Sequence, residues 1–187
     1  SGGPAPPTPP AWTREMGGWM QTILPFVDEK AGGPLPYDKL NVIKLPPGAK
    51  FHGTAVHDIT LLSEDYPGPG ARYFEETLAH ENAHQWWGVL VSPTDTLLSR
   101  WLSEGLATLS QVDYTAARRI PAAERDAYLA RRYREHRVLV RYHTEYETFP
   151  PLVVENPAQA PQEQPQYTIW AYIRSAGILE SMRTAIG

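Results

Sequence analysis

The sequence predicts an α+β fold in which a small N-terminal β-sheet is followed by a mostly helical part. Residues 38–45 and 54–62 are rich in β-branched and apolar residues, which favour strands, and residues 46–48 (Pro-Pro-Gly) turn the chain between them. From about residue 72 onward, apolar periodicity and helix-start signals recur along the chain. The chain has 187 residues, which fits one domain with a sizeable core.

The expected elements can be placed in chain order. A first helix is indicated by an apolar stripe at i, i+4, i+7 and i+11, formed by Trp12, Met16, Trp19 and Ile23. After the two strands we expect helices over about residues 72–89, 100–119, 121–145 and 167–185. Residues 149–166 contain five prolines and are expected to be irregular, either as a connection or as a lid that leads into the last helix.

Composition narrows the class of protein. The net charge of −4 argues against nucleic acid as a partner. The chain has no cysteine, so disulfides, thiolate ligands and cysteine nucleophiles are excluded, while the cellular compartment stays undefined. No run of eighteen apolar residues occurs, so we expect no membrane-spanning segment.

Residues 80–84 (His-Glu-Asn-Ala-His) form an H-E-x-x-H motif within the predicted helix 72–89. His80 and His84 lie one turn apart on one helical face, so both imidazoles can bind the same ion at about 2.0–2.1 Å. Glu81 leaves the helix about 100° further round and borders the ion without having to bind it. A carboxylate there can act as general base toward a water that the ion activates. The motif therefore predicts a catalytic zinc site with one Zn²⁺ per chain.

A catalytic zinc site needs a third protein ligand and an open position. The preferred candidate is Glu104, twenty positions after His84, in a segment whose apolar stripe indicates a second helix. Asp95 also lies between the motifs, but its Ser-Pro-Thr-Asp context is typical of a turn. Trp87 and Leu90 stand where the metzincin pattern would place a glycine and its third ligand, so that subclass is excluded.

Four segments carry a resemblance to a known family. They are residues 80–88 (HENAHQWWG), residues 101–105 (WLSEG), residues 35–43 (LPYDKLNVI) and residues 172–177 (YIRSAG). The first two resemble the paired signatures of the M1 metallopeptidases, the gluzincins that include aminopeptidase N and leukotriene A4 hydrolase. The third resembles the upstream PY-x-K-L strand of that family, and the fourth stands where the family has Y-x-K-G. The resemblance implies a thermolysin-like zincin catalytic domain.

The resemblance also implies a reaction, the zinc-dependent hydrolysis of a peptide bond. The implied zinc ligands are His80, His84 and Glu104. Glu81 would activate the attacking water, and Tyr172 would donate a hydrogen bond to the oxyanion of the tetrahedral intermediate. Tyr167 would be a second tyrosine near the scissile bond.

One strand departs from the family pattern. Aminopeptidases of this family carry a G-x-M-E-N strand whose glutamate binds the free amino group of the substrate. Residues 53–58 (Gly-Thr-Ala-Val-His-Asp) correspond to it, with Gly53 retained and Val56 in place of the glutamate. Asp58 is two positions further along, on the same face of the expected strand, and His57 would border the cleft. Gly53, His57 and Asp58 are therefore candidate substrate-binding residues, and the choice between exo- and endopeptidase stays open.

For the domain organisation, we expect residues 1–11 to be a proline-rich linker or an appended tail. Residues 12–187 would form a zinc metallopeptidase catalytic domain, truncated relative to the full family domain, whose members carry further flanking domains. A peptide is the expected substrate. A catalytically impaired zinc-binding scaffold within a larger assembly is the alternative function, and a zinc hydrolase of another bond is a third.

Overall fold

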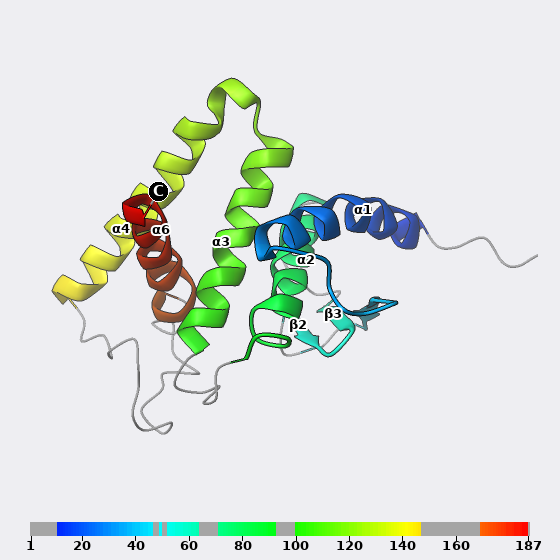
Figure 1. Cartoon of the computed structure of the whole chain (residues 1–187). Helices are drawn as coiled ribbons and strands as arrows, with labels where there is room; N and C mark the ends of the chain where they lie inside the picture. The colour runs from blue at the N-terminus through cyan, green and yellow to red at the C-terminus, as the bar shows by residue number, and fades with distance from the viewer. Residues whose placement is uncertain are drawn as a thin grey trace, which may run out of the picture.

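The structure is a computed structural model of the chain, and it describes residues 11–46, 49, 52–63, 71–92, 100–146 and 169–186. Within these ranges a small sheet precedes a mostly helical part, which confirms the predicted α+β class (Figure 1). Residues 47 and 48 of the turn expected over 46–48, the segment 149–166 and Tyr167 lie outside the described residues, as does Asp95. The interpretation of the first residues as a linker or tail stays a prediction, because the described part begins with α1 at Ala11.

The helices follow one another in the order that the sequence predicts, with changes in their bounds, and the second expected strand is divided into two. The elements are α1 (Ala11–Ala31), β1 (Asn41–Leu45), β2 (Gly53–Val56), β3 (Ile59–Ser63), α2 (Ala71–Trp86), α3 (Arg100–Arg119), η1 (Ala122–Glu124), α4 (Arg125–Tyr146), η3 (Ile169–Arg174) and α6 (Ser175–Ile186). Among the described helices, none has both the length and the apolar character needed to cross a membrane.

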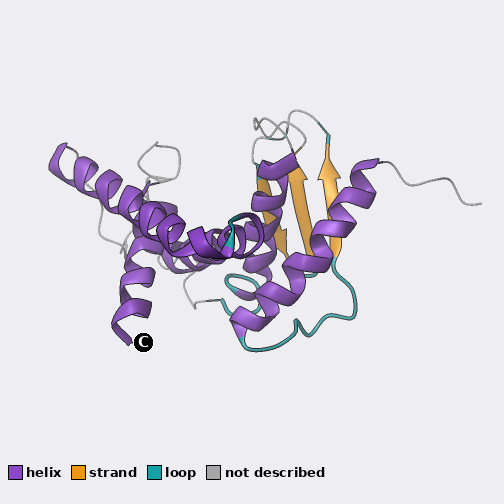
Figure 2. Ribbon diagram, turned by 90° about the horizontal axis from the view of Figure 1, so that it is seen from above, coloured by secondary structure: helices purple, strands orange, loops and turns teal. Residues whose placement is uncertain are grey.

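The sheet differs from the prediction in one respect. Residues 54–62 were expected to form one strand, but the chain reverses at His57 and Asp58 and makes two, β2 and β3. Asp58 has a φ of 51°, a left-handed conformation that aspartate tolerates better than most residues. β3 lies in the centre, antiparallel to β2 and parallel to β1, and the three strands lie side by side in Figure 2. Asp58 therefore does not share a strand face with Val56.

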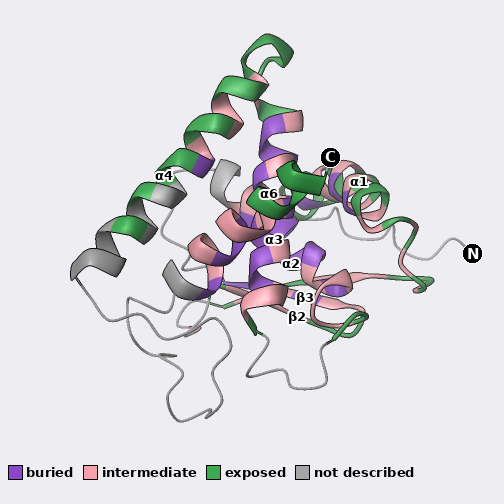
Figure 3. Cartoon of the chain, turned by 60° about the vertical axis from the view of Figure 1, so that its left-hand side comes forward, coloured by how far each residue is buried: buried purple, intermediate pink, exposed green. Residues whose placement is uncertain are grey.

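The core forms where α1, α2, α3 and the sheet meet. The apolar stripe of α1 extends to Val27, and Ile23 and Val27 are fully buried. Leu78 from α2 and Tyr114 from α3 complete the contact, together with Leu62 from β3. Figure 3 shows the buried residues concentrated along α2 and α3, at the centre of the molecule. This packing fixes the relative position of the two helices that carry the H-E-x-x-H motif and Glu104.

The C-terminal elements pack on the other side of α3. α4 and α6 both contact α3, and Figure 1 shows α3 between this pair and α2. Gly105 permits the approach of α6, because a Cβ at this position would lie 2.7 Å from the Cβ of Ser175. The helix predicted over 167–185 begins, in the described part, as a π-helical segment, η3, before it becomes α6. π-helical turns are rare in proteins, and those that do occur are often found at functional sites.

Gln85 connects α2 to the β2–β3 turn. Its side chain is fully buried, and its Nε2 donates to the carbonyl oxygens of Val56 at 2.9 Å and Ile59 at 3.0 Å. A buried amide of this kind needs such partners, since an unsatisfied one costs free energy. The residue directly after His84 therefore holds the edge strand against the motif helix.

Candidate metal centre

His80 and His84 lie on one face of α2, as their spacing predicts, and their Nε2 atoms are 3.1 Å apart. The Nδ1 atom of His84 lies 3.0 Å from the carbonyl oxygen of Trp87. Nδ1–H can therefore donate to this carbonyl, which leaves the lone pair of Nε2 directed at the centre. Gly88 allows the chain to turn here, with a φ of 129° that other residues rarely adopt.

Glu104 reaches the same point from α3. Its Oε2 atom lies 3.3 Å from Nε2 of His80 and 3.0 Å from Nε2 of His84. Burial alone would raise the pKa of Glu104, but its close contacts with the two imidazoles hold this pKa well below its usual range. Burial would lower the pKa of His84, and its contact with Glu104 raises it instead. The carboxylate is thus kept anionic within a group of three atoms suited to a cation.

Glu81 lies beside this group on α2 and is buried. Burial raises the pKa of its carboxyl, and the charges of His80 and His84 partly oppose the rise. β2 passes directly over the carboxyl: a Cβ at Gly53 would lie 2.7 Å from both Cγ and Oε1 of Glu81. Glycine at this position therefore makes room for the Glu81 side chain.

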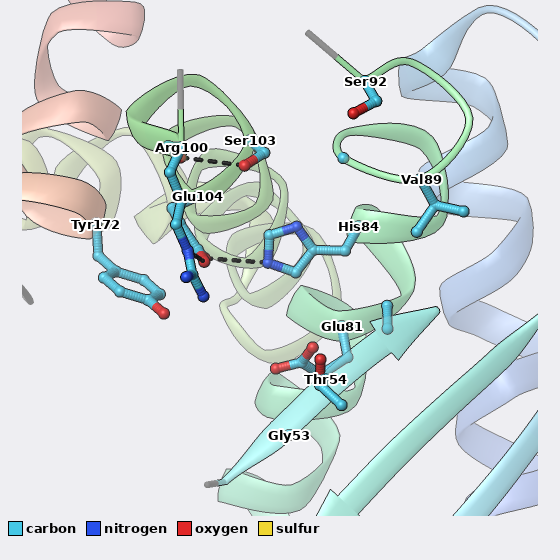
Figure 4. A pocket seen from close by; sticks show the side chains of 12 residues that line it. Gly53, Thr54, Glu81, His84, Val89, Ser92, Arg100, Ser103, Glu104 and Tyr172 are labelled. Atoms are coloured by element: carbon cyan, nitrogen blue, oxygen red, sulfur yellow. Dashed lines mark hydrogen bonds and ion pairs between the residues drawn. The ribbon is translucent and has the colours of Figure 1, made fainter. Parts of the chain in front are cut away.

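A cavity of about 260 Å³ opens onto these residues. Figure 4 shows Glu81 and His84 facing it from α2, Glu104 and Arg100 from α3, and Tyr172 from η3. The ring of Tyr172 stacks on that of His80 with centroids 5.7 Å apart. The cavity thus brings together residues from four elements that are far apart in the sequence, including the edge strand β2.

The described candidate substrate-binding residues do not all lie at the cavity. Gly53 lines the cavity, whereas His57 and Asp58 lie in the β2–β3 turn and are absent from its lining. His57 is largely exposed, its ring contacts Tyr37, and its Nδ1 lies 3.6 Å from the Asp58 carboxylate. Val56 is 48% exposed and is also not among the lining residues. A role for His57 or Asp58 in binding substrate stays a prediction, as does that of Tyr167, outside the described residues.

Two contacts at the centre were missed in the sequence. Arg100 donates from Nε to Oε1 of Glu104 at 3.3 Å, and the Trp87 carbonyl orients His84. The first has a sequence signal, because residues four apart on a helix face one another and Arg100 precedes Glu104 by four positions. The second has none, since it depends on how the chain leaves α2.

Comparisons with known proteins agree with this geometry. No protein-family model matches the chain. Aminopeptidase O of Homo sapiens is 32% identical over 111 residues, and that of Mus musculus is 30% identical over 112 residues. Each match covers 59% of this chain and only 13% of the relative's length. The crystal structure of an M1 zinc metallopeptidase from Deinococcus radiodurans superposes with a TM-score of 0.62 and 24% identity, over all of this chain and 36% of that one.

The chain resembles the M1 metallopeptidases, as its motifs predict. A mutant of the Deinococcus radiodurans enzyme gives the same TM-score at 22% identity, and at these identities the structural matches bear on the fold. The fold of this chain is thus that of part of an M1 zinc metallopeptidase.

The donor set fits a single zinc ion. One ligand atom from each of His80, His84 and Glu104 lies within 4.8 Å of the other two. Two imidazole nitrogens and one carboxylate oxygen are a ligand set of catalytic zinc sites, which keep a further position open. The open side here is the cavity onto which Glu81 and Tyr172 face.

Proposed function

We propose that this chain is the catalytic part of a zinc-dependent peptidase that hydrolyses peptide bonds. The observation that carries the proposal is the convergence of His80, His84 and Glu104 beside the buried carboxyl of Glu81, next to a cavity that His84, Glu104 and Glu81 line. The similar proteins are an aminopeptidase and an M1 zinc metallopeptidase, which supports the same class of reaction.

His80, His84 and Glu104 would hold the zinc ion. When bound, the ion acts as a Lewis acid toward the scissile carbonyl and makes a nearby water more acidic. Glu81 takes a proton from the attacking water as the water oxygen bonds to the carbonyl carbon. Burial raises the pKa of Glu81, which makes its carboxylate a stronger base than an exposed one.

The intermediate collapses when the bond between carbon and nitrogen breaks. Glu81 returns its proton to the leaving amine, so the proton that it removed is the one that it delivers. Tyr172 donates a hydrogen bond to the oxyanion, a role supported by its position on the cavity beside His80. The phenol suits this role because it is an uncharged donor at neutral pH.

Glu81→Gln tests the mechanism. The amide keeps the size of the side chain but cannot accept the proton, so we expect kcat to fall by about 10²–10⁴-fold. Zinc content, measured by atomic absorption on the purified protein, should stay at the wild-type level. Normal turnover of an internally quenched peptide by this variant would rule out Glu81 as the base.

Whether the peptidase requires a free amino terminus on its substrate is a separate part of the proposal. Among the described residues that line the cavity, only Glu81 and Glu104 are acidic. The resemblance to the family pairs Val56 with the glutamate that would bind a free amino group. A buried ammonium needs such a partner. We therefore propose a peptidase that does not depend on a free amino terminus.

That no amine-binding carboxylate is found among the described lining residues also favours the alternative of a zinc-binding scaffold without turnover. Both can be tested with matched peptides, one set with a free amino terminus and one acetylated, each assayed with and without a chelator. Chelator-sensitive cleavage of both sets would support the proposal, and cleavage of free-ended peptides alone would overturn its second part. Zinc binding without cleavage of any peptide would favour the scaffold.

A further inference from the structure

The carboxylate of Glu104 is held from two sides. Its Oε2 atom faces Nε2 of His80 and of His84, at 3.3 Å and 3.0 Å. Its other oxygen, Oε1, accepts a hydrogen bond from Nε of Arg100 at 3.3 Å. The two oxygens of one ligand therefore have different partners, and the plane of the carboxylate is fixed by groups at both ends.

Arg100 is the first residue of α3 and lies one turn before Glu104. Its side chain is 45% exposed and lines the cavity, whereas that of Glu104 is only 6% exposed. A pair four residues apart on an exposed helix face contributes little. Here the acceptor is buried and forms part of the metal centre, so its orientation determines which oxygen reaches the ion.

We propose that Arg100 is a positioning residue of the zinc site, which holds Oε1 of Glu104 so that Oε2 alone is presented to the ion. The proposal rests on the zinc site of the proposed function. A carboxylate can bind a metal with one oxygen or with both. A second oxygen from Glu104 would take up coordination space that a catalytic zinc site keeps for water and substrate. Arg100 thus preserves the open position and orients the third ligand.

The same helix supplies a matched control. Arg119, in the last turn of α3, pairs with the buried carboxylate of Glu75 on α2. The exposed fractions of the two pairs are nearly equal: 45% and 6% for Arg100 and Glu104, 43% and 5% for Arg119 and Glu75. Arg119 is not among the cavity-lining residues, and Glu75 does not belong to the metal cluster. The same substitution at both arginines therefore separates an effect on the metal from a general effect on helix packing.

The test compares Arg100→Gln, Arg100→Lys and Arg119→Gln in the full chain. Zinc affinity is measured by competition with a chromophoric chelator, and coordination is followed by the visible absorption of the Co²⁺-substituted protein, which is sensitive to coordination number. We expect Arg100→Gln to weaken zinc binding about 10–100-fold, the usual effect of removing a group that orients a ligand. We also expect it to reduce the Co²⁺ absorption as Glu104 becomes free to bind with both oxygens.

The other two variants have defined expectations. Arg100→Lys keeps a charged donor without the planar geometry of arginine, so it should recover part of the lost affinity. Arg119→Gln should lower the melting temperature and leave zinc affinity and the Co²⁺ spectrum unchanged. Wild-type affinity and spectrum in Arg100→Gln would overturn the proposal. Equal loss of affinity in Arg119→Gln would also overturn it, because loosened helix packing would then be the cause.

The readouts need no substrate, which keeps this proposal separate from the peptidase assignment. A wild-type chain that binds zinc but cleaves no peptide would overturn the peptidase function while leaving the role of Arg100 intact. An unchanged zinc affinity in Arg100→Gln, with full peptidase activity in the wild type, would overturn only the role of Arg100. A wild-type chain without zinc affinity would overturn both.

Discussion

Two buried glutamates of the helical part, Glu75 and Glu104, have similar burial and each is paired with an arginine of α3. Their other partners differ. Glu75 accepts a hydrogen bond from the Tyr114 hydroxyl at 2.7 Å, and that hydroxyl lies 2.8 Å from Thr22 Oγ1 on α1. Glu104 instead faces two imidazoles and a cavity.

The difference shows that burial and an arginine partner do not by themselves define a functional carboxylate. Around Glu75, the tyrosine and arginine are donors that satisfy its charge and connect α1, α2 and α3. Around Glu104, two of the partners are imidazoles, whose Nε2 atoms can act as ligands for the same ion. One site is complete within the protein, whereas the other is arranged for a cation.

The largest effect is expected for Glu104→Gln. The amide keeps the shape but lacks the charge, so zinc affinity should fall by more than about a hundred-fold, the upper end of what groups around the ligands contribute. Zinc at about 100 times its dissociation constant stabilises a folded protein by about 2.7 kcal/mol. Calorimetry should show this stabilisation in the wild type and not in the variant. If Glu104→Gln bound zinc as tightly as the wild type, Glu104 would be no more important for the metal than Glu75.

Gly53→Ala tests a third buried glutamate, Glu81, without changing it. The new methyl group would lie 2.7 Å from the Glu81 carboxyl, so the carboxyl has to move. A displacement of about 1 Å at a reacting group can cost about 10²-fold in rate, and we expect a loss of kcat of that order with zinc retained.

Gly18→Ala is the matched control for this variant. It adds the same methyl group on α1, where nothing lies within 4 Å, and should leave the rate unchanged. Equal rates for the two variants would show that the close approach of β2 to Glu81 has no part in catalysis.

Glu75→Gln should have the smallest effect on function. Removing a charged acceptor from Tyr114 and Arg119 costs about 1–3 kcal/mol of stability. For a chain of this length that corresponds to a fall in melting temperature of about 2–4 °C per kcal/mol, measurable by circular dichroism. Zinc affinity should not change. Glu29→Gln, at an exposed position on α1, is the control and should leave both the melting temperature and the zinc affinity unaltered. A loss of zinc affinity in Glu75→Gln would mean that the two glutamates are coupled.

Much of the metal centre could be predicted because it depends on local geometry. The spacing of His80 and His84 places them on one face of any α-helix, and the stripe around Glu104 predicts its helix. Whether these side chains meet depends on how the helices pack against each other. The resemblance to a known family implied that they do, whereas the spacing of the residues alone could not predict it. The close approach of Gly53 to Glu81 is likewise a contact between distant segments and leaves no local pattern.

The misassigned strand has a local cause. The residues of β2 and β3 have similar strand preferences, and the turn between them contains neither glycine nor proline, so Asp58 carried the only turn signal. The π-helical segment at Tyr172 could not be predicted either, because one extra residue per turn changes the hydrogen bonds without requiring particular side chains.

The anchoring of the edge strand by Gln85 bears on which substitutions that strand can accept. Its amide binds the main-chain oxygens of Val56 and Ile59, which every residue type possesses. The side chain at position 56 can therefore be exchanged, a glutamate for a valine or the reverse, without loosening the strand from the metal-binding helix. The side chain at position 56 and the support of the strand thus depend on different atoms, so a substitution there leaves the main-chain contacts of Gln85 in place.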